Sequence, residues 1–302
     1  MSAPPSVIVV GSVNMDLVVT VPALPRPGET VAGGSFTRAL GGKGANQAAA
    51  AAKLGARVWL VGLTGDDDFG REARADLEAR GVDISSLGYS SAPTGVASIL
   101  VDGDGRNLIA VASSANHELT GVEVTERLSA LSAESAVLLA NLEIPDEAIT
   151  AAAEQASGRG WTLVLNPAPA RPLPQGLLAR CDVLTPNEAE ADALGSVEAL
   201  LRLGVGAIVV TLGADGARVH RSDGTTTHQP SITVDVVDTT GAGDAFNGAL
   251  VWSLASGHGL EEAVRWATAA GALACRALGA RASLPDREEL ERATAMPGRS
   301  RS

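Results

Sequence analysis

Short apolar runs recur along the chain, and stretches with a helical period separate them. The runs are SVIVVG (6–11), RVWLVGLTG (57–65), AVLLANLEIP (136–145), TLVLNPAP (162–169), DVLTPNE (182–188) and AIVVTLGADG (207–216). Each is too short for a free-standing helix and is rich in β-branched residues, which favours strands. Ala-rich stretches such as ANQAAAAAKLG (45–55) predict helices between them. This alternation predicts an α/β fold, with a mostly parallel central sheet and helices on both faces.

Two regions break this rhythm. VNMDLVVTV (13–21) alternates polar and apolar residues, and TGVASILVDGDGRNLIAVA (94–112) is typical of a β-hairpin that turns at its DG steps. We expect lid strands at about 13–21, 31–39, 94–101 and 107–112. They would form a small separate sheet that covers a crevice or serves as an oligomer interface. The alternative is that they are ordinary edge strands of the main sheet.

The chain shows no fixed-period repeat and no long linker, so we predict one domain over residues 1–295 and a frayed tail over 296–302. The 302 residues are 45% hydrophobic, which is enough to bury a sizeable core. Lys and Arg number 23 and Asp and Glu 35, so the formal net charge is −12. That balance argues against nucleic acid and anionic membranes as partners.

The cysteine content and the hydropathy of the sequence bear on where the protein is located. Only two cysteines are present, Cys181 and Cys275, which favours a reducing cytoplasm over a disulfide framework. No signal-peptide pattern is visible, and no apolar run reaches the roughly 18 residues of a membrane span.

Polar residues follow almost every apolar run, and ligands of open α/β sheets bind at the carboxyl ends of the strands. The stretch VDTTGAGDAFNGAL (237–250) places Gly241, Ala242 and Gly243 before a helical pattern. The unpaired N–H groups at such a helix start form an anion-binding hole. Asp244 would then accept a proton from a substrate hydroxyl that attacks a phosphoryl group held there. The alternative is that Asp244 only complements the helix dipole.

A second concentration is GGKGAN (41–46), where three glycines surround Lys43 and Asn46 is expected to open a helix. Such a glycine density favours close approach to a ligand over a solvated turn. Asn14 and Asp16 lie two apart on a predicted strand, so they share a face and could hold vicinal hydroxyls. A solvent-facing polar edge explains that pair equally well.

Three further motifs follow strands. In PNEAEA (186–191), Asn187 and Glu190 have the spacing of a capping box, and they could instead organise hydrated Mg²⁺ and phosphate oxygens. Glu143 is either a helix-start residue or an acceptor for a hydroxyl. TLGADG (211–216) is a Gly-rich turn.

Several classes of site are disfavoured. No G-x-G-x-x-G follows the first strand, where GSVNMD stands, and no G-x-x-x-x-G-K-[ST] occurs, so neither an NAD-dependent oxidoreductase nor a P-loop enzyme is indicated. The histidines lie outside all the motifs, which argues against histidine catalysis and a zinc site; they are His117, His220, His228 and His258.

Together these residues resemble the ribokinase-type carbohydrate kinase family, from about Val7 to Pro285. GGKGANQAAAAAKLGA and DTTGAGDAFNGAL carry the resemblance, and GSVNMDLVV, LPRPGET, LNPAPAR and TPNEAEA strengthen it. The resemblance implies a three-layer α/β sandwich with a β-sheet lid, and ATP-dependent phosphorylation of a sugar hydroxyl, with D-ribose giving ribose 5-phosphate. It further implies Mg²⁺, an activating K⁺ and a homodimer formed through the lid sheet.

The resemblance also assigns roles to positions of this chain. Asp244 matches the catalytic base, and Gly241, Ala242 and Gly243 match the anion hole. The sugar-binding positions are Asn14, Asp16, Gly42, Lys43, Gly44, Ala45, Asn46, Glu143 and Asp244. The ATP-binding positions are Asn187, Thr211, Leu212, Gly213, Ala214, Asp215, Gly216, Gly243, Asp244 and Thr268, where Thr268 replaces a larger adenine-contacting residue. The magnesium region includes Glu190, and the monovalent-cation positions are Asp238, Thr240, Ala274, Ala277, Gly279 and Ser283.

Two other functions stay open at this stage. One is a kinase of the same family for another acceptor, such as 2-deoxyribose, fructose or a nucleoside, although the scarcity of aromatic residues disfavours stacking a nucleobase. The other is a non-catalytic sugar-binding protein, which would have no need of a base at Asp244.

Overall fold

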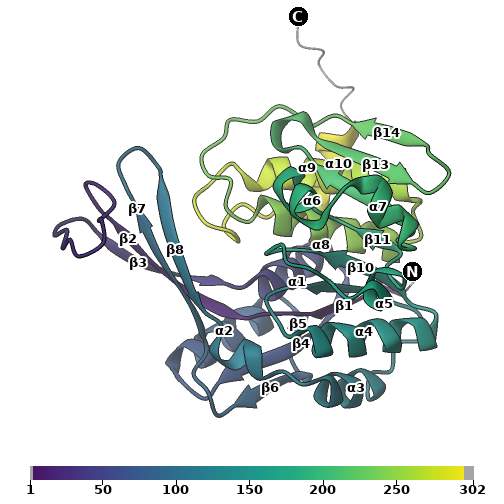
Figure 1. The fold of residues 1–302 in the computed structure, drawn as a ribbon, viewed down its shortest axis with the longest axis horizontal. Coiled ribbons are helices and arrows are strands. Elements are labelled where there is room, and N and C mark those ends of the chain that lie inside the picture. Colours follow the sequence, from purple (N-terminus) through teal and green to yellow (C-terminus); the bar gives the residue numbers. More distant parts are fainter. Residues whose placement is uncertain (1–2, 296–302) are drawn as a thin grey trace, which may run out of the picture.

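The computed structural model of the chain describes residues 3–295, so the predicted frayed tail at 296–302 lies outside the described residues. The main sheet has the strand order β14-β13-β12-β11-β10-β9-β1-β4-β5, with β6 paired to β4 (Figure 1). Its strands are β1 Ser6–Val10, β4 Arg57–Gly65, β5 Val82–Asp83, β6 Leu87–Ser90, β9 Val137–Asn141, β10 Thr162–Asn166, β11 Val183–Leu184, β12 Ala207–Thr211, β13 Ala217–Arg221 and β14 Thr226–Gln229. All pairings are parallel except those of β13 with β12 and with β14. The predicted mostly parallel sheet is confirmed.

Helices cover both faces of this sheet. The α-helices are α1 Lys43–Lys53, α2 Asp68–Ala79, α3 Gly121–Ser129, α4 Asp146–Arg159, α5 Gln175–Leu178, α6 Glu188–Leu194, α7 Val197–Arg202, α8 Ala242–Ala255, α9 Leu260–Ala274 and α10 Arg287–Ala295. Two short 3-10 helices are η1 Ser114–Glu118 and η2 Gly213–Asp215. One core cluster joins the sheet to α1, α2, α8, α9 and α10, and a second joins its other face to α3 through α7.

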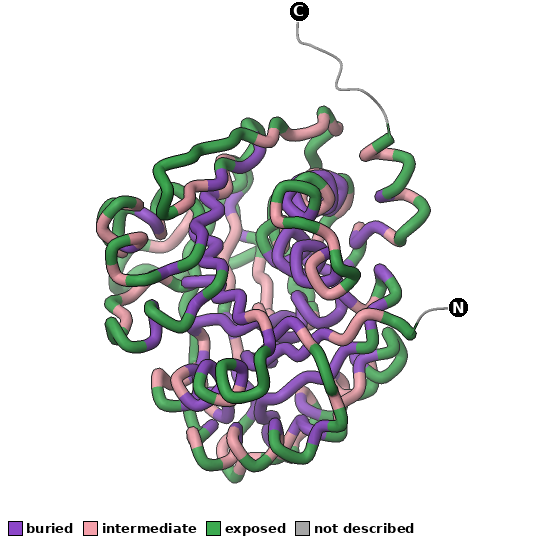
Figure 2. Tube along the Cα trace, turned by 90° about the vertical axis from the view of Figure 1, so that its right-hand side faces the viewer, coloured by how far each residue is buried: buried purple, intermediate pink, exposed green. Residues whose placement is uncertain are grey.

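The strand β1 shows how the sequence creates these two cores. Val7 and Val9 belong to one cluster and Ile8 and Val10 to the other, and all four are fully buried. Successive side chains of a strand point to opposite faces, so a strand covered on both sides must be apolar throughout. The buried segments accordingly run through the middle of the body (Figure 2).

The four remaining strands form a separate sheet that projects from the side of the body (Figure 1). They are β2 Asn14–Thr20, β3 Phe36–Gly41, β7 Gly95–Val101 and β8 Asn107–Ala112, in the order β3-β2-β7-β8. We call this four-stranded sheet the lid. The β7–β8 hairpin turns over residues 102–106, as its DG steps predict.

Local boundaries differ from the sequence expectations in two places. The lid strand expected at 31–39 begins only at Phe36, because Gly33 and Gly34 adopt positive φ values of 103° and 101° that no strand accommodates. The helix expected to open at Asn46 begins earlier, at Lys43, because Gly42 already serves as its N-cap. Asn46 therefore lies inside the first turn.

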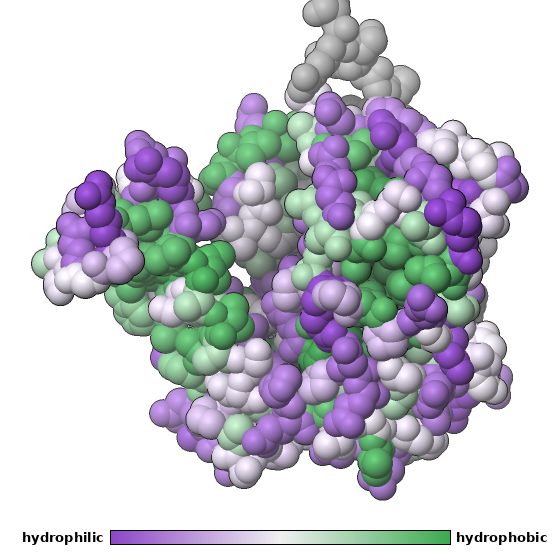
Figure 3. Space-filling model, in the orientation of Figure 1, coloured by the Kyte–Doolittle hydropathy of each residue, from purple (hydrophilic) through white to green (hydrophobic). Residues whose placement is uncertain are grey.

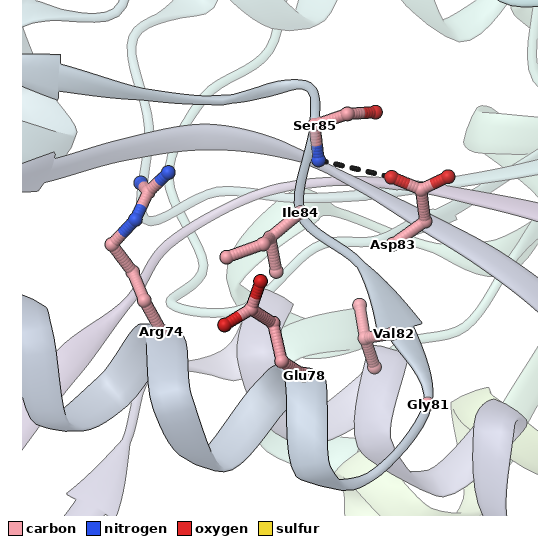
Figure 4. A pocket seen from close by; sticks show the side chains of 7 residues that line it. All are labelled: Arg74, Glu78, Gly81, Val82, Asp83, Ile84 and Ser85. Atoms are coloured by element: carbon pink, nitrogen blue, oxygen red, sulfur yellow. Dashed lines mark hydrogen bonds between the residues drawn. The ribbon is translucent and has the colours of Figure 1, made fainter.

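The lid and the body leave a hollow between them on the side seen in Figure 3. Another surface hollow, of about 570 Å³, lies between α2 and the segment that follows it, and Arg74, Glu78 and Asp83 are among its lining residues (Figure 4). None of the predicted site residues lines this second hollow. Within residues 3–295, no helix has both the length and the apolar character needed to cross a membrane.

Candidate active site

The start of α8 is an open helix N-terminus. Gly241 is its N-cap with φ 78° in the left-handed region, and no side chain caps it. The Ala242 N–H donates to the Thr239 carbonyl at 3.2 Å, whereas the N–H groups of Gly243 and Asp244 have no acceptor within residues 3–295. Free N–H groups at the positive end of a helix dipole attract an anion. The Ala242 N–H is therefore excluded from the predicted anion hole, because it already donates a hydrogen bond to Thr239.

The Asp244 carboxylate is buried, with 7% of the residue exposed, and it faces the start of α1. Its Oδ2 accepts from Asn46 Nδ2 at 2.9 Å and its Oδ1 accepts from Gln47 Nε2 at 3.0 Å. Burial raises the Asp244 pKa above its ordinary value; Lys43 and the two amide donors oppose that rise without cancelling it. A carboxylate with a raised pKa is a stronger base, which suits proton abstraction.

The start of α1 is held by a carboxylate from another element. Gly42 caps α1 with φ 86° and offers no side chain, and Glu143 from the β9–α4 connection accepts the Lys43 N–H at 3.1 Å. The Ser12 hydroxyl donates to the same Glu143 oxygen. Glu143 precedes Pro145, the N-cap of α4, so it is not a start residue of that helix; it anchors α1 instead. Burial lowers the Lys43 pKa, but the charges of Asp244, Glu143 and Glu190 outweigh burial and raise it, so Lys43 stays cationic.

The lid contributes Asn14 and Asp16 from β2, next to the start of α1. Asn14 Oδ1 accepts from Asn116 Nδ2 at 2.7 Å, and the Asn116 side chain also bonds both backbone groups of Val13. Burial and the nearby charge of Glu143 raise the pKa of Asp16 to about 6, although Arg281 opposes the rise. Asp16 makes no hydrogen bond to a side chain in the described part of the chain, so its oxygens are available to hydroxyl donors.

Gly41 leaves room for the Asp16 carboxylate. A Cβ atom at Gly41 would lie 2.2 Å from Asp16 Oδ1, closer than real contacts permit. The backbone of β3 therefore passes against this carboxylate only because residue 41 has no side chain.

The predicted nucleotide region consists of two adjacent turns. Asn187 and Glu190 form a reciprocal capping box, with both hydrogen bonds at 2.8 Å, so this alternative from the sequence is confirmed. Asn187 pairs with Thr211 as an isolated bridge, and the Thr211 N–H donates to the Pro186 carbonyl at 2.9 Å. The 211–216 turn thus lies beside the PNE turn, and the charge of Glu190 reaches Lys43.

The loop after α9 meets the segment that leads into α8. Asp238 Oδ1 accepts from the backbone and hydroxyl of Thr240, at 2.9 and 2.7 Å, and its Oδ2 accepts the Gly279 N–H at 2.8 Å. The Ser283 hydroxyl donates to the Ala274 carbonyl. The hydrogen bonds from Gly279 and Thr240 outweigh burial and hold the Asp238 pKa below its ordinary value. Hydrogen bonds therefore join three of the predicted cation positions, Asp238, Thr240 and Gly279, and separately the pair Ala274 and Ser283. Ala277 lies in the loop between Ala274 and Gly279.

Among the predicted ATP-binding positions, Thr268 is nearly fully buried. Thr268 lies in α9 with 6% of the residue exposed, and its hydroxyl is buried without a hydrogen-bond partner within residues 3–295. Its assignment to ATP stays a prediction. Sequence reasoning missed Gln47, Asn116 and Arg281. Gln47 directly follows the GGKGAN motif, which could have drawn attention to it, whereas nothing in the local sequence marks the other two.

The fold and this site define a class of protein. The model of the pfkB family of carbohydrate kinases matches residues 4–287, so the chain belongs to that family. Within it, the chain is similar to the ribokinase of Haemophilus influenzae, with 38% identity over 93% of this chain and 95% of that protein. It is similar to the ribokinase of Bacillus subtilis, with 39% identity over 95% of this chain and 98% of that protein.

Solved structures of ribokinases share the fold of this chain. The ribokinase of Thermotoga maritima superposes with a TM-score of 0.86 at 37% identity, covering 95% of this chain and 98% of that one. The ribokinase of Arabidopsis thaliana, solved in complex with ribose and ATP, superposes with a TM-score of 0.87 at 31% identity, covering 98% and 100%. The resemblance inferred from the motifs and the predicted fold class are both confirmed.

Sugar binding should depend on the ionisation of Asp16. Because its pKa is raised to about 6, the carboxylate that accepts hydroxyl hydrogen bonds is fully present only above that pH. We expect sugar affinity to fall as the pH drops through about 6, measured by calorimetry with D-ribose as the probe. The Asp16→Asn variant should bind weakly with a flat profile over the same range. A wild-type affinity that stays constant down to about pH 5 would contradict this role.

The Gly41→Ala substitution should weaken sugar binding, because the new Cβ would displace the Asp16 carboxylate. We expect a loss of affinity of about tenfold, equivalent to about 1.4 kcal/mol. Gly103→Ala is the matched control, because Gly103 lies in the lid hairpin and a Cβ atom there would meet no other atom within 4 Å. Equal affinities of the two variants would show that the close approach at Gly41 is unimportant.

Proposed function

We propose that the protein transfers the γ-phosphoryl group of ATP to the 5-hydroxyl of D-ribose and so forms ribose 5-phosphate. The observation that carries the proposal is the position of Asp244, a buried carboxylate in the first turn of an uncapped helix and in contact with the GGKGAN segment. The similarity to ribokinases, one of them solved with ribose and ATP, supports this choice of acceptor and donor.

In the proposed reaction, Asp244 accepts the proton of the primary hydroxyl while the sugar oxygen attacks the γ-phosphorus in line with the departing ADP. The free N–H groups of Gly243 and Asp244 stabilise the negative charge on the transferred group. The remaining sugar hydroxyls would bind Asn14, Asp16, Lys43, Asn46 and Glu143. Closure of the lid would exclude water and limit ATP hydrolysis.

Two ions belong to the proposal. Mg²⁺ would neutralise phosphate charge, and Glu190 fits a hydrated ion because its capping bond uses only Oε2. K⁺ would bind in the loop region of Asp238, Thr240, Ala274, Ala277, Gly279 and Ser283, where the hydrogen bonds of Asp238 order the backbone. We also place the enzyme in the cytoplasm, which suits ATP as substrate and agrees with two buried free thiols at Cys181 and Cys275.

The Asp244→Asn substitution should abolish most turnover and preserve sugar binding. An amide cannot accept the proton, so we expect kcat to fall by about 10² to 10⁴. ADP release should be measured with ATP, Mg²⁺ and K⁺ across ribose, 2-deoxyribose, fructose and adenosine, with ribose affinity determined in parallel.

Asp192→Asn is the control, because Asp192 is an exposed carboxylate of α6 outside the site. Turnover with a different acceptor would keep the mechanism and change the substrate. Near-normal turnover of Asp244→Asn would remove the base assignment. Ribose binding without turnover in the unmodified protein would indicate a sugar-binding protein instead.

We further propose a homodimer formed through the lid. The lid is apolar on both faces, since the register places Val18, Ile99 and Ile109 on one face and Val19, Leu100 and Leu108 on the other. Phe36, Leu108, Ile109 and Val111 are each more than half exposed, and apolar residues cover much of the visible lid surface (Figure 3). Exposed apolar surface of this kind marks an interaction site.

The Ile109→Glu substitution should therefore produce monomers, because it places a charge in the middle of the apolar lid face. Light scattering coupled to gel filtration gives the mass directly. Asn107→Glu introduces the same side chain on the same strand at its polar end and should leave the dimer intact. A monomeric unmodified protein would refute the proposal.

A further inference from the structure

Arg281 is a buried cation that joins the proposed cation loop to the sugar site. It lies between Gly279 and Ser283 in sequence, and only 8% of the residue is exposed. Its Nε donates to Asn46 Oδ1 at 2.7 Å, its Nη1 to Asp76 Oδ2 at 2.7 Å and its Nη2 to the Gly41 carbonyl at 3.0 Å. Buried guanidinium groups persist only when their donors are satisfied, and here each of the three nitrogens has an acceptor.

The contact with Asn46 fixes the orientation of that amide. A guanidinium group can only donate hydrogen bonds, and an ionised carboxylate can only accept them. With Asn46 Oδ1 bound to Arg281, the Asn46 NH₂ group must point to Asp244, where it donates at 2.9 Å. A rotated amide would place its oxygen against the carboxylate and its hydrogens against the guanidinium, and both contacts would be repulsive.

We propose that Arg281 is a positioning residue for phosphoryl transfer: it locks the Asn46 amide and thereby holds the Asp244 carboxylate in place. The inference rests on the proposed function, in which Asp244 is the base. Arg281 is not among the positions to which the family resemblance assigns a role.

A purely structural role would act through a different nitrogen of the side chain, Nη1, which contacts Asp76. The ion pair with Asp76 ties the loop to α2 and would stabilise the fold without affecting Asn46. The two roles can be separated because Gln retains the hydrogen-bond donor of Arg281 at the Nε place, whereas Lys retains its positive charge. The Nε2 atom of Gln occupies the place of Arg Nε along the side chain, so Gln keeps the donor to Asn46 and loses the charge. Lys keeps the charge for Asp76 but has a methylene group at the Nε place.

The experiment compares Arg281→Lys with Arg281→Gln by kcat, KM and the pH profile of kcat with ribose and ATP. We expect Arg281→Lys to lower kcat about tenfold or more and to move the acid limb upward by about one pH unit, because an unlocked Asn46 amide no longer stabilises the Asp244 carboxylate. Arg281→Gln should recover most of the kcat and move the limb less than Arg281→Lys does, although it removes a cation that opposes the raised pKa of Asp16 and it lowers thermal stability.

The opposite order, with Arg281→Lys normal and Arg281→Gln impaired, would overturn the inference, and so would a normal kcat and pH limb in both variants. Arg281→Lys decides the question even if Arg281→Gln fails to fold, because Lys preserves the ion pair. Asp76→Asn is the control for that ion pair and should lower stability without moving the acid limb. Asp244→Asn, measured alongside, separates the two proposals: if it keeps turnover, the base assignment itself fails, whereas an inactive Asp244→Asn with normal Arg281→Lys removes only the role of Arg281.

Discussion

The burial of the Asp244 carboxylate between two helix starts is the constraint on which the site depends. An ionised carboxylate loses several kcal/mol of hydration on burial and must recover it from donors and nearby cations. Asn46, Gln47 and Lys43 supply them, and all three belong to the first turns of α1. The helix must therefore begin at Lys43, which requires the positive φ of Gly42 and the anchoring of the Lys43 N–H by Glu143. The GGKGAN segment and Asp244 are thus one structural unit.

A network of buried polar side chains extends this unit to the carboxyl ends of the strands. Gln47 Nε2 donates to Asn166 Oδ1 at 3.0 Å as well as to Asp244, and Thr185 donates to Asn247 Oδ1 at 2.6 Å. Asn247 in turn donates to the Gly243 carbonyl at 2.8 Å. Such networks are rigid when every member is satisfied. The proposed base and anion hole consequently lie on fixed elements, while Asn14 and Asp16 lie on the projecting lid.

The sequence allowed the layers, the lid hairpin and the capping box to be predicted, because each depends on residues close together in the chain. The start of β3 at Phe36 could not be predicted, since it depends on the backbone conformations of Gly33 and Gly34. Contacts between distant segments were also missed. Asn116 meets Asn14 across 102 positions and Arg281 meets Asn46 across 235, and no local period records such pairs. Sequence motifs therefore marked the groups that we propose to contact substrate, but not the residues that orient them.

The charge distribution of the site also bears on the direction of the reaction. The charges of Glu143 and Asp244 help to raise the pKa of Asp16, and Arg281 opposes that rise. The charge of Glu143 also helps to raise the pKa of Asp244, and Lys43 opposes that rise. A neutral sugar relieves this repulsion, because its hydroxyl groups donate hydrogen bonds to the carboxylates. A phosphorylated sugar adds negative charge beside the same carboxylates once ADP has left, and like charges at short range repel. For the proposed function, these carboxylates therefore suit a neutral polyol as acceptor, and we expect them to promote release of the phosphorylated product.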